Sequence, residues 1–174
     1  MENVLVVNSE PYDKLLNKHG LIPDASEVIL THIKKDYFFM SRDIAEYCSE
    51  VRQIIPYVLI RRNDSVFAYR RLSAQSEKRL HNKLSVGIGG HINNCDIDNH
   101  DIIMSGLKRE LSEEVSISGD YSLQYVGVIN NLSTEVSKYH IGLLYLLDTN
   151  CLVEVVEKDK LLGEWIKFSE LKNF

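Results

Sequence analysis

Residues 108–117 read KRELSEEVSI and hold three glutamates within five positions, Glu110, Glu113 and Glu114. Upstream apolar residues at helical spacing predict that the stretch ends a helix over residues 99–115. On a helical wheel, at about 100° per residue, the glutamates border the apolar stripe and do not lie opposite it. Charged residues that only keep a helix in contact with water more often lie opposite the core. The stretch is therefore either a solvated helix face or a metal site.

The charges of this cluster are unfavourable without a counter-ion. Glu110 has acids at i+3 and i+4, and each like-charge pair on a helix costs about 0.2–0.5 kcal/mol. Arg109 and Glu113, one i, i+4 step apart, offset part of this cost. A divalent cation would offset more of it, which favours the metal site.

The composition is that of a globular domain. The chain has 174 residues, of which 44% are hydrophobic and 26% charged, enough for one domain with a buried core. A net charge of −5 argues against a partner such as bulk nucleic acid or an anionic membrane. Three scattered cysteines indicate neither a disulfide framework nor a thiolate zinc site. Without a signal peptide or a membrane-spanning apolar stretch, we expect a cytoplasmic protein.

Strand-like stretches lie on both sides of the acidic helix, which predicts a mixed α/β architecture. Strands are expected at residues 4–8, in a hairpin from 54 to 72 that turns at Asn63-Asp64, and at 84–90, 121–130, 140–147, 151–157 and 164–168. Helices are expected at 12–20, 41–53 and from Ser169, whereas 27–33 and 36–40 look extended. Pro56 is expected at a strand start or edge, because proline cannot donate a ladder hydrogen bond. We expect residues 1–53 to form an N-terminal extension packed on a domain over residues 54–174.

The chain resembles the Nudix hydrolase family in the order strand, Gly89-Gly90, loop, amphipathic helix and RELSEE. The family signature is Gly, five residues, Glu, seven residues, then Arg-Glu-aliphatic-x-Glu-Glu-x-Gly-aliphatic. The matching positions are Arg109, Glu110, Leu111, Glu113, Glu114 and Ile117. The motif covers residues 89–117, and the resemblance extends loosely over 54–174.

Three positions depart from that signature. The upstream glutamate, counted back eight positions from Arg109, is Asp101. The interval between Gly90 and this acid then carries about five extra residues. Ser116 replaces the glycine near the helix end, where a left-handed conformation would cost it about 1 kcal/mol. None of these changes removes the three glutamates.

The resemblance implies an α/β (α+β) fold, the Nudix-type α/β/α sandwich with a mixed β-sheet. It also implies a Mg²⁺-dependent hydrolase that cleaves a pyrophosphate bond in a nucleoside diphosphate linked to another moiety, a substrate of the nucleotide or nucleotide-sugar type. Mg²⁺, which Mn²⁺ can replace, neutralises the diphosphate and prefers oxygen ligands. By this resemblance Glu110, Glu113, Glu114 and the Gly89 carbonyl hold the ion, while Arg109 orients a glutamate.

Four further residues are weaker candidates. Glu135 is proposed as a general base from a loop outside the motif, the alternative being an ordinary exposed acid. Arg70 and Arg71 could bind phosphate oxygens or simply be solvated on a hairpin. His91 follows the glycine pair and could contact a phosphate or be a plain loop histidine.

Two other functions stay open. A Nudix-like domain could bind a nucleotide as a sensor without turnover, although loss of the glutamates would then be expected. An isomerase of the same fold, acting on an isoprenoid diphosphate, needs a cysteine and an acid across the pocket, and Cys95 fits that role poorly. We expect a small nucleotide-type substrate as the main partner, and a homodimer, which is common in the family.

Overall fold

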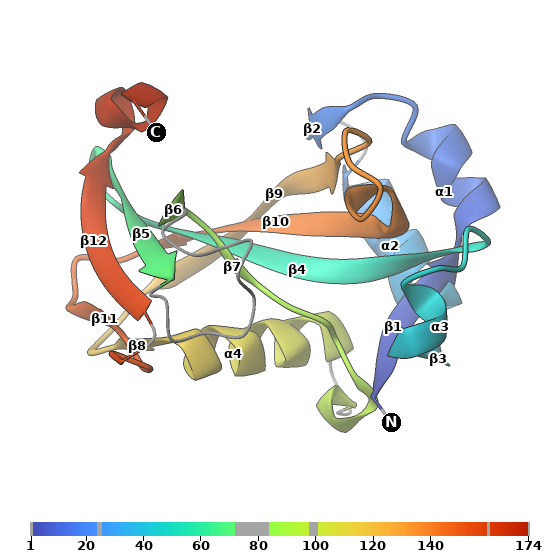
Figure 1. Cartoon of the computed structure of the whole chain (residues 1–174), viewed down its shortest axis with the longest axis horizontal. Helices are drawn as coiled ribbons and strands as arrows, with labels where there is room; N and C mark the ends of the chain where they lie inside the picture. Colours follow the sequence, from blue (N-terminus) through green and yellow to red (C-terminus); the bar gives the residue numbers. More distant parts are fainter. Residues whose placement is uncertain (1, 24–25, 72–83, 98–100, 160, 174) are drawn as a thin grey trace.

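The computed structural model describes residues 2–23, 26–71, 84–97, 101–159 and 161–173 (Figure 1). The strands are β1 (Asn3–Asn8), β2 (Gly20–Ile22), β3 (Phe38–Ser41), β4 (Val51–Arg62), β5 (Ser65–Arg71), β6 (Leu84–Ser85), β7 (Ile88–Gly89), β8 (Val115–Ile117), β9 (Ser122–Asn130), β10 (His140–Asp148), β11 (Val153–Val155) and β12 (Leu161–Lys167). The helices are α1 (Ser9–Leu15), α2 (Ser26–Asp36), α3 (Arg42–Ala45) and α4 (Ile102–Glu114), with the 3₁₀ turns η2 (Asn94–Asp96), η3 (Ser137–Tyr139) and η4 (Phe168–Asn173).

Most strands join one mixed sheet in the order β12-β5-β4-β10-β9-β2. β4 and β10 are parallel along their whole length, from His140 beside Gln53 to Asp148 beside Arg61. The other neighbours pair antiparallel, including the β4–β5 hairpin, whose turn residue Asn63 has a φ of 51°. The predicted mixed-sheet fold and the predicted hairpin turn are therefore confirmed.

Pro56 lies in the middle of β4, so its predicted place at a strand start or edge is wrong. On one side β4 pairs with β10 throughout. On the other side its partner changes from β1, which ends its pairing at Gln53, to β7, which begins at Tyr57. Pro56 falls in the interval between these partners, where the missing N–H breaks no ladder on that side. The same interval opens the cavity described below.

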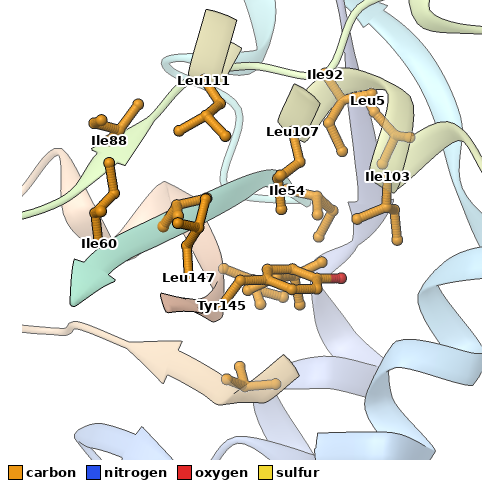
Figure 2. Packing of buried hydrophobic residues seen from close by; sticks show 14 of the residues in the cluster. Leu5, Ile54, Ile60, Ile88, Ile92, Ile103, Leu107, Leu111, Tyr145 and Leu147 are labelled. Carbon is orange, nitrogen blue, oxygen red and sulfur yellow. The ribbon is translucent and has the colours of Figure 1, made fainter. Parts of the chain in front are cut away.

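Helix α4 packs its apolar face on the sheet. It contacts β4 and β7 (Figure 1), and its buried residues include Ile103, Leu107 and Leu111. Figure 2 shows these side chains directed toward Ile54 of β4 and Leu147 of β10, all within one hydrophobic cluster. Burial of one such side chain stabilises the fold by roughly 1.5–3 kcal/mol, so this face fixes the helix and the glutamates that border it.

The N-terminal segment belongs to the same core. β1 pairs with β4 and with β3, and Leu5 and Val7 are fully buried in the cluster that also holds α4. Residues 27–33 form part of helix α2, so the prediction that they are extended is wrong. Ile29 and Ile33, one i, i+4 step apart, are fully buried, which is the helical period and not the alternation of a strand.

Two predicted boundaries are also wrong. The helix expected over 41–53 is only α3, because Val51, Arg52 and Gln53 already pair with β1. Tertiary strand pairing here overrides a weak local helical preference. The final helix is the 3₁₀ turn η4. No helix in the described part of the chain is long and apolar enough to cross a membrane.

Candidate active site

The glycine pair brings the backbone against the glutamate helix. A Cβ added to Gly90 would lie 2.1 Å from Oε2 of Glu110, and one added to Gly89 would lie 2.6 Å from the Pro56 carbonyl oxygen. Any other residue at either position would have to displace these groups. The end of β7 and the last turns of α4 therefore form one close assembly of a backbone segment and a carboxylate.

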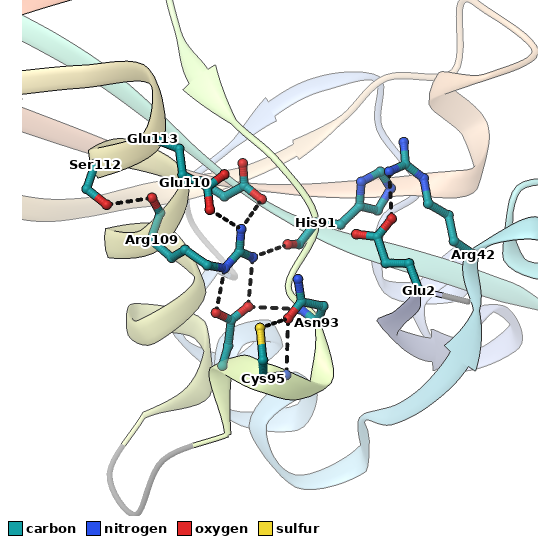
Figure 3. A network of polar contacts seen from close by, with 10 residues as sticks. Glu2, Arg42, His91, Asn93, Cys95, Arg109, Glu110, Ser112 and Glu113 are labelled. Atoms are coloured by element: carbon teal, nitrogen blue, oxygen red, sulfur yellow. Dashed lines mark hydrogen bonds and ion pairs between the residues drawn. The ribbon is translucent and has the colours of Figure 1, made fainter. Parts of the chain in front are cut away.

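Arg109 is the centre of the polar network at this assembly (Figure 3). Its guanidinium donates two hydrogen bonds to Asp96, of 2.7 and 2.9 Å, and one of 2.8 Å to the His91 carbonyl oxygen. Nη1 of Arg109 also donates to Glu110 at 2.8 Å and to Glu113 at 3.3 Å. Arg109 thus joins the loop after β7 to the glutamates of α4.

Asp96, which the sequence analysis did not single out, is the acid that holds Arg109. Its side chain is only 4% exposed, and this burial raises its pKa. Hydrogen bonds from Arg109 and the Asn93 N–H lower the pKa by more than burial raises it, so the pKa lies below its usual value. Asp101 has another role, because its carboxylate caps α4 by accepting from the N–H groups of Ile103 and Met104. The placement of the upstream acid at Asp101 was therefore wrong. Counting forward five intervening residues from Gly90, the spacing of the signature, leads to Asp96.

The three glutamates differ in environment. Glu110 is 18% exposed, and burial, only partly offset by Arg109, raises its pKa. Glu113 is 57% exposed and makes the longest of the Arg109 bonds. Glu114 is half-buried near Tyr57, whose pKa is raised by burial and by this carboxylate. Among the described residues, no three acidic, histidine or cysteine side chains stand close enough together to hold an ion as they are.

The donor atoms nevertheless suit a hard divalent cation. The assembly offers only carboxylate and backbone carbonyl oxygens, the ligands that Mg²⁺ and Mn²⁺ prefer. Gly90 leaves free the space against Glu110 that a side chain would fill. The raised pKa of Glu110 reflects a buried negative charge that Arg109 alone does not fully compensate.

A cavity of 890 Å³ opens beside this assembly, within the size range of small-molecule sites. Gly89, Gly90 and Glu110 line one end, which we call the helix end. Glu2, Arg42 and His140 line another part, which we call the far end, and Figure 3 shows Glu2 and Arg42 away from Glu110. The loop between β9 and β10 contributes a further wall, with Asn131, Thr134, Val136 and Ser137.

His91 joins the two ends. Its carbonyl oxygen accepts from Arg109, while its ring lies toward Glu2 and Arg42 (Figure 3). Burial, reinforced by Arg42 and His140, lowers the pKa of His91 to about 4, and burial also lowers the pKa of His140. Both rings are therefore uncharged at neutral pH. Nε2 of His91 donates to Oε1 of the fully buried Gln53 at 2.9 Å.

The remaining predicted residues lie in different places. Glu135 is in the loop between two lining residues, but its side chain is 89% exposed and pairs with Lys138. Arg70 lies on β5 and pairs with Glu164 of β12, away from the cavity lining. Arg71 ends β5, and its side chain lies outside the described part of the structure. Among the proposed phosphate contacts whose side chains the structure describes, only His91 lines the cavity.

Known proteins with similar sequence or structure cover nearly the whole chain. Protein YmaB of Bacillus subtilis (strain 168) is 37% identical over an alignment of 185 positions, which covers 99% of this chain and 89% of YmaB. The crystal structure of Tm1382, named as a candidate Nudix hydrolase, superimposes with a TM-score of 0.83 at 36% identity, over 99% of this chain and 89% of Tm1382. DR0079 from Deinococcus radiodurans, at 19% identity, a TM-score of 0.54 and 78% of each chain, shares the fold. No protein-family model matches the chain.

Proposed function

Because the chain belongs to the Nudix hydrolase family, we propose that it is a Mg²⁺-dependent hydrolase of a nucleoside diphosphate linked to another moiety. The observation that supports this most directly is the position of Glu110. Its carboxylate lies against the glycine backbone at the helix end of a cavity large enough for a nucleotide. Glu113 and Glu114 follow on the same helix, within one turn of Glu110.

Glu110, Glu113, Glu114 and the Gly89 carbonyl would hold the metal ion. When bound, Mg²⁺ neutralises the diphosphate and lowers the pKa of a water molecule. Arg109 orients Glu110 through its 2.8 Å bond and is itself fixed by Asp96, so it positions a ligand and does not need to touch substrate. Glu113 is more than half exposed, and its long bond to Arg109 lets its carboxylate turn at little cost.

Proton removal is assigned to Glu135 as a proposal. The residue is flanked by Thr134 and Val136, which line the cavity, so a modest change in this loop would turn its carboxylate inward. Its partner in the described structure is the exposed Lys138, and such a surface pair contributes little to stability. Little free energy therefore opposes that movement.

The test is a hydrolysis screen of the purified protein with Mg²⁺ against nucleoside diphosphate sugars, dinucleotides and nucleoside triphosphates. We expect metal-dependent release of a monophosphate, reduced at least about 10²-fold in Glu114→Gln. Mn²⁺ binding, followed by electron paramagnetic resonance, should weaken in the same variant. Glu10→Gln, which removes an exposed i, i+4 pair with Lys14, is the control and should change neither property.

Two results would contradict the proposal. Hydrolysis that is independent of metal, or that survives Glu114→Gln unchanged, would remove the glutamates from the reaction. Nucleotide binding without product under any metal condition would identify a sensor.

A further inference from the structure

The far end of the cavity is built by the N-terminal segment. Glu2 precedes β1 and Arg42 begins α3, and the β1–β3 ladder brings them together, with Asn3 opposite Ser41. The Arg42 N–H donates to the Glu2 carbonyl oxygen at 2.9 Å, and Nη1 of Arg42 donates to the Glu2 carboxylate at 2.9 Å. Backbone and side chain thus fix the same pair. β1 continues into pairing with β4, which anchors this wall to the central sheet.

We infer that Glu2 and Arg42 are specificity-determining residues, which bind the group that the substrate carries beyond its diphosphate. The same geometry identifies that group as neutral and rich in hydroxyls, as a sugar is, and not as a further phosphate. The inference rests on the proposed function, since it places the diphosphate at the helix end beside Glu110.

The charges that line the cavity favour a neutral group over a phosphate at the far end. Its described lining residues include one cation, Arg42, and two carboxylates, Glu2 and Glu110. Arg42 is already engaged twice, because its Nε also donates to Glu46 at 3.0 Å. A phosphate at the far end would have to compete with Glu2 for Arg42 while lying beside a like charge. A neutral group meets no such repulsion.

The hydrogen-bonding groups of Glu2 and Arg42 together favour a hydroxyl group. The Glu2 carboxylate only accepts, and the Nη2 of Arg42, which makes no hydrogen bond within the described structure, only donates. Side by side they suit a hydroxyl group, which does both. A phosphate oxygen without its proton only accepts, so it could use Arg42 but would leave Glu2 without a donor.

The two histidines extend the same pattern. Nδ1 of His140 donates to the Val136 carbonyl oxygen at 2.8 Å, and Nε2 of His91 donates to Gln53. Each ring therefore already uses one nitrogen in a hydrogen bond within the protein. Asn131, Thr134 and Ser137 add neutral polar groups from the loop. These neutral polar groups suit a ligand that carries hydroxyl groups.

Fold stability does not account for this ion pair. The side chains of Arg42 and Glu2 are 41% and 42% exposed, and ion pairs of this exposure contribute little to stability. Both side chains line the cavity, so part of their exposed surface faces its interior.

The experiment compares ADP-ribose and UDP-glucose with ATP and diadenosine tetraphosphate, using the full chain with Mg²⁺. We expect the wild-type kcat/KM to favour the sugar diphosphates at least tenfold. Glu2→Gln and Arg42→Ala should lower it about tenfold for the sugar diphosphates, mainly through KM. Glu2→Gln should also raise the use of ATP, because it removes the like charge, and a purely structural role would not produce that gain.

Glu46→Gln is the matched control. It removes the other carboxylate bonded to Arg42, with the same isosteric change, but Glu46 does not line the cavity. We expect its kcat/KM for the sugar diphosphates to stay within twofold. Thermal unfolding of each variant checks that the folds are comparable, and calorimetric binding of ADP-ribose and ATP, with Ca²⁺ in place of Mg²⁺, measures affinity without turnover.

The outcomes separate the two proposals. If no substrate is hydrolysed, the proposed function fails, and the calorimetric affinities of wild type and Glu2→Gln still test the far end. If hydrolysis occurs but ATP or the tetraphosphate is preferred, the inference is overturned and the proposed function stands. Equal effects of Glu2→Gln and Glu46→Gln would likewise overturn it.

Discussion

Replacing Asp96 with asparagine tests whether one buried ion pair positions the proposed metal ligands. The side chain of Asp96 is 4% exposed and accepts three hydrogen bonds, two from Arg109 and one from the Asn93 N–H. Asparagine has the same shape but a single acceptor oxygen, so its amide N–H groups would face donors. Arg109 would lose one charge-assisted bond and its closest counter-charge.

The magnitude follows from this geometry. Removing one partner from a fully buried pair costs about 3–5 kcal/mol. Arg109 is itself 25% exposed and keeps Glu110, so the penalty is smaller. We expect Asp96→Asn to lower the free energy of unfolding by about 2–3 kcal/mol. Because Arg109 also positions Glu110, kcat/KM should fall about 10–100-fold, the usual effect of losing a group that orients a metal ligand.

Urea unfolding, followed by the fluorescence of the single tryptophan Trp165, measures the stability change. Asp148→Asn is the matched control, because Asp148 also binds an arginine, Arg61, through both carboxylate oxygens. The Asp148 side chain is 37% exposed, so water compensates for the lost bond and the stability loss should be clearly smaller. Equal losses in the two variants would refute the role assigned to burial.

The pH dependence provides an independent check. The pKa of Asp96 is lowered in the folded state from its ordinary value of 3.8, so the charged carboxylate stabilises the fold above that pH. This contribution is lost as the pH falls through the lower folded-state pKa. The stability difference between wild type and Asp96→Asn should therefore be constant near neutral pH and shrink below about pH 4. A difference that grows on acidification would contradict this assignment.

Four other substitutions have distinct expected outcomes. Gly90→Ala should reduce activity and Mn²⁺ affinity at least about tenfold with little loss of stability, because the added Cβ meets only the mobile end of Glu110. In Gly127→Ala the new Cβ would lie 2.9 Å from the Ile22 carbonyl oxygen, so this variant should lose stability and keep its activity. Unfolding and kinetics are measured for both variants. Glu135→Gln should lower kcat about 10²–10⁴-fold with little change in KM, and an unchanged kcat would assign proton removal to another group. Cys95→Ser should leave hydrolysis unchanged, because this exposed thiol bonds only to Asn93 within the described structure. A large loss of activity would instead favour the isomerase function.

The sequence predicted the parts of the molecule that depend on local spacing. The acidic helix, the glycine pair before it and the Asn63-Asp64 turn are each specified within a few residues, so their patterns can be recognised in isolation. The helix α2 was missed because its four apolar residues, 28, 29, 30 and 33, fit a strand run as well as a helix face. Only packing against the core, which buries Ile29 and Ile33 together, decides between them.

Asp96 and Asp101 show a different limit. Both carboxylates precede the helix, and a count from either end of the motif selects a different one. The choice depends on where the extra residues of the loop are inserted, and only the contacts of the folded chain show this. Asp101 lies at the helix start and bonds the free N–H groups there, whereas Asp96 in η2 faces Arg109. A loop inserted after η2 leaves the Asp96–Arg109 pair intact, so the network tolerates the insertion.

The far end of the cavity could not be predicted because its residues have no common motif. Glu2 and Arg42 are separated by forty positions, and only the antiparallel register of β1 and β3 makes them neighbours. His91 and His140 come from two further segments and meet at a ring separation of 5.8 Å. The chemistry at the helix end is encoded by one contiguous stretch, whereas the surface for the rest of the substrate is assembled from four. A change in the N-terminal segment can therefore alter which substrate is bound without altering the glutamates at the helix end.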